Sequence, residues 1–368
     1  MSRKLYLIGL VLLGAMLLSA CSGTVRANTW PGLNADEETA YLSNINFVYG
    51  VNLKDGREAW RFSDKDDNKA LFYAQPLITP DGLIVVGSAA GKYKLYAIDP
   101  QDIIKGEKTN SPAVAWTFSG ASSPWVAAPL VVDNLLFAPN SDGNLYIFDL
   151  NDGQSQKQPV KTVELGGQLW AQPVTDGKEV FITSLDHSVF AVDIDTYDVT
   201  WHTDLSAAIP GGPALGSDGM IYVGSLTSKL EQIDPGTGEH KPVFDAKDWL
   251  WSAPAVGGDS LYFGDVSGNF YSFNTADAQL DWSIQPDGAI TAGAIFHNDL
   301  VVLATESGFI YAIDKNGDVK WSDEVGGEIY TTPVAVGDLT LIAPLNTDFN
   351  LAAFDSVGRQ VWTFIPEK

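Results

Sequence analysis

Short apolar runs alternate with turn residues along almost the whole chain. The runs are four to seven residues long and rich in Val, Ile, Leu, Tyr and Phe, which is typical of strands and too short for the usual helix. The stretch from 330 to 364 is a full example. It starts small-small-Pro and has a Gly-Asp turn, a polar turn and a Gly turn between its apolar runs. Such a unit predicts four short strands joined by turns.

The same unit recurs along the chain. The phrase "FIYAIDKNGDVKW" at 309–321 returns in part as "LYAIDPQD" at 95–102 and more fully as "VFAVDIDTYDVTW" at 189–201. The position that opens the unit falls every 39 to 53 residues, at Pro31, Pro76, Pro129, Pro173, Pro213, Pro254, Gly293 and Pro333. The aromatic position that closes it holds Trp60, Trp116, Trp201, Trp282, Trp321 and Trp362, and we expect Val163 and Val243 to replace it in the third and fifth units.

Eight units of four strands predict an all-β fold, an eight-bladed β-propeller of four-stranded antiparallel blades. Packing blade on blade covers both apolar faces of each sheet. The alternative is a pair of stacked β-sandwiches, whose strands need no common phase. We predict a single domain over residues 30–368. The first unit has its own first strand and the last unit its own last strand, which allows closure between two complete blades, but the sequence leaves this arrangement and the exchange of a strand both open.

The first 20 residues have the layout of a signal peptide. A short basic start precedes the apolar run from Leu5 to Leu18, which is shorter than the roughly 20 residues that span a bilayer. The sequence "LSAC" that ends at Cys21 resembles a bacterial lipobox, which implies cleavage before Cys21 and lipidation of its thiol. The alternative is an ordinary secretory signal that leaves a free cysteine. Residues 21–29 predict a flexible tether.

The resemblance to a lipobox also implies a location in the cell envelope. Ser22 follows the cysteine, and the sorting rule for such lipoproteins then implies the outer membrane, facing the periplasm, if the source has two membranes. Otherwise the protein is expected on the outer face of the cytoplasmic membrane.

The chain is strongly acidic, with 22 basic and 46 acidic residues and a formal net charge of −24. Nucleic-acid binding needs clusters of Lys and Arg, so we expect no nucleic-acid partner. Membrane attachment is expected through the lipid alone, and the charge favours basic protein partners.

No motif in the chain predicts a catalytic or metal centre. The four histidines, at 187, 202, 240 and 297, lack metal-ligand spacing. The segment Asp64–Ala70 begins like a calcium loop, but Lys69 stands at its glycine position and Gln75 at its glutamate position. The Asp or Asn that ends each third strand accepts backbone N–H groups in the following turn. We therefore predict a non-enzyme without metal or cofactor.

The pattern "AIDxxxGxxxW", present as "AIDKNGDVKW" at 312–321 and in part as "NLKDGREAW" at 52–60, resembles the repeat of quinoprotein-type (PQQ-like) propellers. In that family the Trp docks against the Gly-containing turn of a neighbouring blade. The similarity covers residues 30 to 366. A lipoprotein propeller of this size resembles the BamB family, the scaffold lipoproteins of the outer-membrane β-barrel assembly machinery. Quinone-dependent dehydrogenases are longer, and many carry an adjacent Cys pair and a calcium cluster, which this chain lacks.

Aromatic residues gather in the loops that lead into the first strand of several units, called inner loops below. In a propeller these loops ring the mouth of the central channel, on the same face as the turns between second and third strands. The candidate partner-binding residues are Tyr73, Trp125, Trp170, Trp251 and Tyr330. An aromatic cluster with a polar rim suits protein recognition, but the rings can also simply pack between blades.

The resemblance and the aromatic cluster together predict a membrane-anchored, non-catalytic scaffold that binds another protein. We expect a monomer within a larger complex. The alternative is an extracytoplasmic sensor or ligand-binding propeller.

Overall fold

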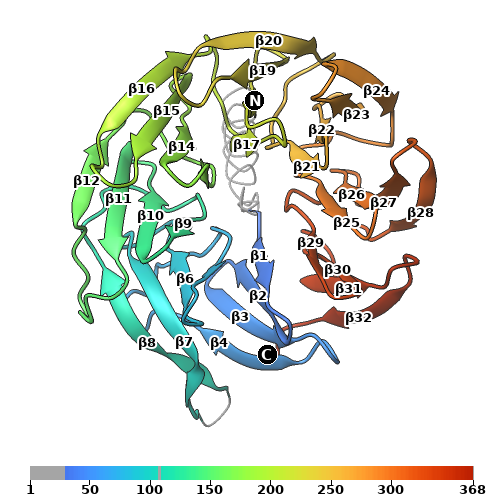
Figure 1. Cartoon of the computed structure of the whole chain (residues 1–368). Coiled ribbons are helices and arrows are strands. Elements are labelled where there is room, and N and C mark those ends of the chain that lie inside the picture. Colours follow the sequence, from blue (N-terminus) through green and yellow to red (C-terminus); the bar gives the residue numbers. More distant parts are fainter. Residues whose placement is uncertain (1–29, 107–108, 368) are drawn as a thin grey trace, which may run out of the picture.

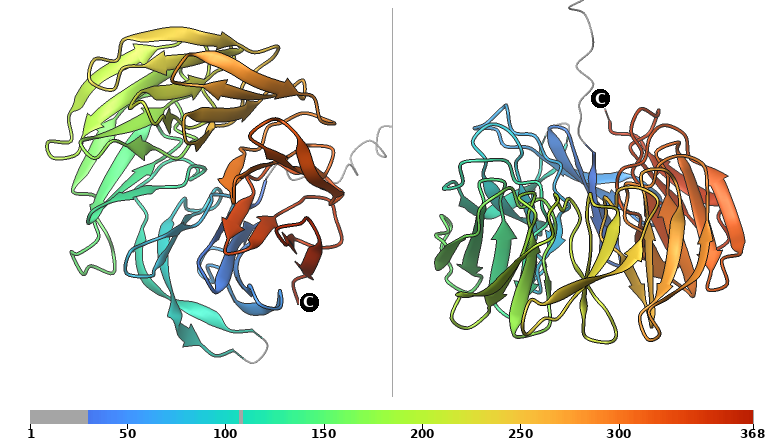
Figure 2. Two further views of the ribbon diagram at one scale, coloured as in Figure 1. Left: turned by 45° about the vertical axis from the view of Figure 1, so that its right-hand side comes forward. Right: turned by 90° about the horizontal axis from the view of Figure 1, so that it is seen from above.

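The computed structural model describes residues 30–106 and 109–367, so the predicted signal peptide, Cys21 and the predicted tether lie outside the described residues. Eight four-stranded sheets form a ring in chain order (Figure 1). The side-on view in Figure 2 shows the blades standing next to one another in a single layer. The predicted all-β, eight-bladed propeller is confirmed. No helix in the described part of the chain is long and apolar enough to cross a membrane.

The blades are numbered 1 to 8 along the chain. Blade 1 contains β1 (Gly32–Ala35), β2 (Thr39–Asn44), β3 (Phe47–Asn52) and β4 (Glu58–Phe62), and blade 2 contains β5 (Leu77–Ile78), β6 (Ile84–Gly87), β7 (Leu95–Ile104) and β8 (Ser111–Phe118). Blade 3 contains β9 (Leu130–Val132), β10 (Leu135–Pro139), β11 (Asn144–Asp149) and β12 (Lys161–Glu164), and blade 4 contains β13 (Val174–Thr175), β14 (Glu179–Thr183), β15 (Ser188–Asp193) and β16 (Val199–Asp204).

The second half of the ring repeats this order. Blade 5 contains β17 (Ala214–Leu215), β18 (Ile221–Gly224), β19 (Lys229–Ile233) and β20 (His240–Asp245), and blade 6 contains β21 (Ala255–Gly257), β22 (Ser260–Gly264), β23 (Phe270–Asn274) and β24 (Gln279–Ile284). Blade 7 contains β25 (Ile295–His297), β26 (Leu300–Ala304), β27 (Phe309–Asp314) and β28 (Val319–Glu324), and blade 8 contains β29 (Val334–Val336), β30 (Leu339–Ile342), β31 (Leu351–Phe354) and β32 (Gln360–Phe364).

Each blade is a complete antiparallel sheet whose strands pair in sequence order, with its first strand on the inside of the ring (Figure 1). The apolar core lies between neighbouring blades. Leu42 of blade 1, for example, shares a buried cluster with Leu341 and Ala353 of blade 8. Closure therefore joins two complete blades, which the sequence had left open.

In blades 4, 6, 7 and 8, the closing tryptophan packs on the glycine of the third-to-fourth-strand turn of the next blade. A side chain placed on Gly238 in blade 5 would lie 2.7 Å from the ring of Trp201 in blade 4, and Gly358 in blade 8 has the same relation to Trp321 in blade 7. The Trp201 indole also donates to the backbone oxygen of Pro235 at 2.7 Å. A glycine is required there because any Cβ would overlap the ring.

The blades without a closing tryptophan are followed by blades without this glycine. Blades 3 and 5 lack the Trp, and the equivalent turn positions in blades 4 and 6 hold Tyr197 and Ala278, with φ of 62° and 54°. These turns keep the left-handed backbone but have no indole above them. The closing Trp of blades 4, 6, 7 and 8 and the turn Gly of the blade that follows each of them therefore form one interblade contact.

The predicted replacements Val163 and Val243 are wrong. In the other blades, one residue of the third strand pairs with the closing tryptophan of the fourth strand. The equivalent third-strand residue pairs with Lys161 in blade 3 and with Lys241 in blade 5. Both lysines are exposed. Val163 lies two residues further along and is buried between blades 3 and 4.

The start of the seventh unit is also shifted by one residue from its predicted position. Strand β25 begins at Ile295, whereas the first strands of blades 6 and 8 begin directly after Pro254 and Pro333. Ala294 is therefore the structural equivalent of those prolines, in place of Gly293.

Candidate protein-binding cavity

The inner loops alternate between a buried position and a position that faces the channel. Four residues before the opening proline, the side chain is apolar and buried in every described inner loop. These side chains are Phe72, Trp125, Leu169, Ile209, Leu250, Ile290 and Ile329. The next residue lines the central cavity in every one of these loops, with Tyr73, Val126, Trp170, Pro210, Trp251, Thr291 and Tyr330.

The central cavity has a volume of about 1370 Å³ and is lined by the innermost segments of all eight blades. Four of the five predicted residues are brought together there: Tyr73, Trp170, Trp251 and Tyr330. Each is half-buried, with part of its side chain accessible from the cavity. That they bind a partner stays a prediction.

Trp125 is not part of this surface. Its side chain is 1% exposed and packs edge-on against Phe118 and at a tilt against Tyr146, with centroid distances of 6.4 and 5.6 Å. Its indole N–H donates to the backbone oxygen of Tyr93 at 2.8 Å. Trp125 occupies the buried position of its inner loop, one residue before the position that faces the cavity, so it stabilises the contact between blades 2 and 3.

The cavity also contains aromatic residues that the sequence pattern did not single out. Trp30, Trp249, Phe296 and Phe349 all line it. The side chain of Trp249 is 49% exposed and that of Phe296 42%. Trp249 lies two residues before Trp251 in the same loop. The alternation of buried and channel-facing residues is the signal that places both tryptophans on the cavity side of buried Leu250.

Hydrogen bonds between neighbouring inner segments hold the cavity wall in place. The side chain of Asn34 donates to the backbone oxygen of Pro76 at 2.9 Å, and Thr183 to that of Gly211 at 2.8 Å. The ring is completed where Thr331 of blade 8 donates to the oxygen of Pro31 in blade 1 at 2.6 Å. The cavity is therefore supported by contacts between blades and is preformed.

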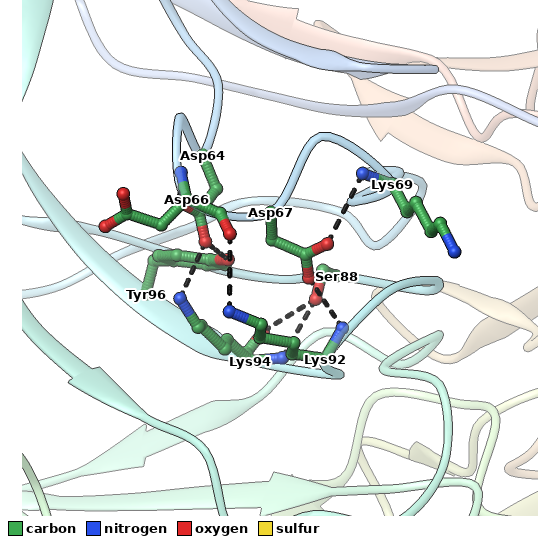
Figure 3. Close-up of polar contacts among 8 residues, drawn as sticks. All are labelled: Asp64, Asp66, Asp67, Lys69, Ser88, Lys92, Lys94 and Tyr96. Carbon is green, nitrogen blue, oxygen red and sulfur yellow. Dashed lines mark hydrogen bonds and ion pairs between the residues drawn. The ribbon is translucent and has the colours of Figure 1, made fainter.

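The segment from Asp64 to Ala70 precedes the second inner loop, and the carboxylates of Asp64 and Asp67 are engaged by protein groups (Figure 3). Asp64 accepts hydrogen bonds from the Lys94 ammonium and the Tyr96 hydroxyl, both at 2.7 Å. Burial raises the pKa of Asp64, but the hydrogen bonds from Lys94, Tyr96 and the Asp66 backbone, together with the charge of Lys94, outweigh it and hold the pKa below its usual value. Asp67 accepts from the backbone N–H of Lys92 at 2.6 Å. The segment ties its loop to the neighbouring turn of blade 2.

The same tyrosine–carboxylate pairing recurs in other blades, and the sequence pattern did not predict it. Tyr271 donates to Asp265 and Tyr311 to Asp287, each at 2.7 Å. In each case a third-strand tyrosine reaches a carboxylate in a loop or turn beside the inner loops, so these pairs fix the loops around the cavity mouth.

The described residues contain no group of three or more His, Cys, Asp or Glu placed to hold a metal ion. The histidines lie on separate elements, at the β14–β15 turn and in β16, β20 and β25. What the cavity offers chemically is aromatic surface, backbone and amide groups, and two carboxylates, Glu306 and Glu328.

A closed ring of eight four-stranded blades, tied by tryptophans that pack on turns of the next blade, defines a PQQ-like β-propeller. The family model described as "Outer membrane protein assembly factor BamB" matches residues 31–240, 186–295 and 285–367. These matches cover nearly all of the propeller, and the protein belongs to the BamB family.

Individual relatives are distant. The BamB of Moranella endobia is 21% identical over 298 residues, which span 77% of this chain and 71% of the relative. That of Burkholderia pseudomallei is 23% identical over 152 residues, only 38% of this chain and 39% of the relative. The crystal structure of BamB from Moraxella catarrhalis superposes with a TM-score of 0.69 at 16% identity, covering 85% of this chain and 92% of that chain. A computationally designed protein, Ika8, matches the fold equally well, with a TM-score of 0.70 at 14% identity.

Proposed function

We propose that this protein is a lipid-anchored, non-catalytic scaffold that binds a protein component of the outer-membrane β-barrel assembly machinery through its central cavity. The observation that carries the proposal is the convergence of Tyr73, Trp170, Trp251 and Tyr330 on one preformed cavity. Membership of the BamB family supports the assembly role.

The position of the first described residues, at the cavity, supports the proposal that the partner is bound close to the membrane. Trp30 and Pro31, the first described residues, line the cavity. The tether of residues 21–29 spans at most about 30 Å when extended. If Cys21 carries the lipid, the cavity mouth therefore stays close to the outer membrane, on its periplasmic side.

Partner capture by cavity variants tests the proposal. Purified lipidated protein is used to capture partners from membranes solubilised in mild detergent, and melting curves are recorded on the same samples. Trp170→Ala and Trp251→Ala should each weaken capture, because interface tryptophans often cost 2 kcal/mol or more when truncated, about thirtyfold in affinity. Leu280→Ala, which changes an exposed apolar side chain on the outer strand β24, is the control.

The melting curves separate binding from packing. Rings that only pack between blades would lower the melting temperature and leave capture per folded molecule unchanged. Normal capture by both tryptophan variants would remove the cavity as the binding surface.

A further inference from the structure

The lining of the central cavity carries negative charge and no balancing cation. It contains two carboxylates, Glu306 and Glu328, and no Lys, Arg or His in the described part of the chain. They lie on neighbouring blades. Glu306 is in the turn between β26 and β27 of blade 7, and Glu328 is in the inner loop that leads into β29 of blade 8.

Both carboxylates are held in position by the surrounding loops. Glu306 accepts a hydrogen bond from the Thr291 hydroxyl at 2.9 Å, and Glu328 accepts one from the Asn346 amide at 2.9 Å. Their backbones are fixed as well, since the Glu306 N–H donates to Ala289 at 2.9 Å and Glu328 forms a β-bridge with Leu345. A ligand would therefore meet two acceptors that are already oriented.

Neither carboxylate takes part in an ion pair within residues 30–106 and 109–367, although both side chains are half-buried. A carboxylate that is partly removed from water without a counter-charge interacts more strongly with a cation than one on the open surface does. The cavity thus favours a cationic group near blades 7 and 8.

Aromatic rings lie on both sides of these carboxylates in the ring of blades. Tyr330 follows Glu328 by two residues in the same inner loop, and Trp249 and Trp251 belong to the adjacent blade 6. The faces of Trp and Tyr attract Lys ammonium and Arg guanidinium groups. Carboxylates and aromatic faces together are complementary to a cation that is attached to apolar surface.

We infer that the cavity binds an arginine or lysine side chain within an extended, otherwise apolar segment of the partner protein. This inference rests on the proposed function and specifies the chemistry of the partner. The formal net charge of −24 adds long-range attraction for a basic segment. A polypeptide suits the site because apolar lining residues such as Val126, Pro210 and Phe349 offer contacts to its flanking side chains.

Binding of a defined peptide pair tests the inference. The probe is a fluorescein-labelled nine-residue peptide with one central arginine between leucine and phenylalanine residues, and its counterpart carries glutamine at the centre. Fluorescence anisotropy measures the Kd of each peptide for the full-length protein in 50 and 500 mM NaCl. We expect the arginine peptide to bind about tenfold more tightly at low salt, and the difference to shrink at high salt.

Variants that remove carboxylate charges show which residues cause the preference for the arginine peptide. The double variant Glu306→Gln/Glu328→Gln should abolish most of the preference for arginine, because it keeps the shape of the cavity and removes its charge. Glu324→Gln, on the exposed outer strand β28 of blade 7, is the matched control and should keep the preference. Equal binding of the two peptides, no binding of the arginine peptide, or an unchanged preference in the double variant would each overturn the inference.

Together, the partner-capture and peptide-binding experiments distinguish a failure of this inference from a failure of the proposed function. If Trp170→Ala and Trp251→Ala weaken capture while the peptides show no charge preference, the scaffold function stands and the cation site is wrong. If the peptides show the preference but capture does not depend on the tryptophans, the cation site stands and the cavity is not the docking surface for the assembly machinery.

Discussion

The indole N–H of Trp362 donates a hydrogen bond to the backbone oxygen of Leu53 at 2.8 Å, and 309 residues separate the two in the chain. The contact joins the last blade to the first and uses the same Trp-on-turn geometry as the blades inside the ring. The ring closes without exchange of a strand, so side-chain contacts of this kind hold its ends together.

The first prediction concerns this closing contact. A Cβ on Gly56 would lie 2.7 Å from the Trp362 ring, and the φ of Gly56 is +70°. Gly56→Ala should lower the free energy of unfolding by about 2–4 kcal/mol, since left-handed strain and overpacking add. Gly153→Ala is the control, because Gly153 has a φ of +64° and a Cβ added there would meet no atom within 4 Å. It should cost about 1 kcal/mol. Equal urea midpoints for the two variants would contradict the closure.

The second prediction compares two tryptophans whose indole N–H groups differ in hydrogen bonding. Trp362 donates to Leu53, whereas the indole nitrogen of Trp321 is buried without a hydrogen-bond partner in the described structure. Trp362→Phe should therefore cost about 1 kcal/mol more than Trp321→Phe in urea unfolding. The two rings pack on equivalent glycine turns, so each serves as control for the other. The reverse order would show that the indole hydrogen bond does not contribute to closure.

Lys157 is a buried cation with a structural role, and its removal should destabilise the protein. Its side chain is 1% exposed. The ammonium donates to the backbone oxygen of Asp149 at 2.7 Å, pairs with Asp152, and lies 5.7 Å from the centre of the Trp116 ring. Lys157→Met should cost about 2–3 kcal/mol, because Asp152 then loses its counter-charge.

Exposed Lys161 supplies the matched control for this change. Lys161→Met should alter the free energy of unfolding by less than about 0.5 kcal/mol. Thermal and urea unfolding of both variants measure the difference, and a loss at Lys157 as small as that at Lys161 would contradict the structural role.

Low pH should destabilise the cavity face because the Asp265 carboxylate becomes protonated. Burial raises the pKa of this carboxyl, but hydrogen bonds from the Asn269 backbone, the Tyr271 hydroxyl and the side chains of Asn269 and Ser267 lower it below 3.8 overall. Because the folded pKa is the lower one, the stabilisation is present above pH 3.8 and is lost as the pH falls through the folded value. Tyr271→Phe removes one of these bonds and should weaken the pH dependence of unfolding between about pH 5 and 2. An unchanged slope would contradict the assignment.

The anchor is tested by Cys21→Ser. Cys21 is the only cysteine, so the variant cannot be lipidated on another thiol. Several acyl chains bind a membrane stably, whereas one binds marginally, and the variant should leave the membrane fraction. Western blots of fractionated cells measure this. A variant that is cleaved at its signal and remains on membranes would show that another feature anchors the protein.

Repetition in the sequence was sufficient to predict the blades. The turn residues and the two-residue periodicity of each strand act locally, so the four strands of every unit and the number of units could be inferred from the chain alone. The docking of Trp on a glycine turn came from the family resemblance, and its pairing is visible in spacings such as Trp201 to Gly238. The error at Val243 arose because a β-bulge shifts the register of blade 5 at this residue, and the error at Val163 because the register of the last two strands of blade 3, which pair without a bulge, is not visible in the pattern.

Which aromatic side chains reach the cavity depends on the packing of the blades and was visible only in the structure. Trp125 and Trp170 stand in similar loops one position apart, yet the first is buried between blades and the second faces the channel. The propeller and the inner loops could be predicted from the amino-acid pattern, because they follow from local hydrogen bonding and apolar periodicity. The placement of Glu306 and Glu328 on one cavity, the burial of Lys157 and the contact of Trp362 with Leu53 depend on how blades pack around a closed ring, which no single repeat encodes.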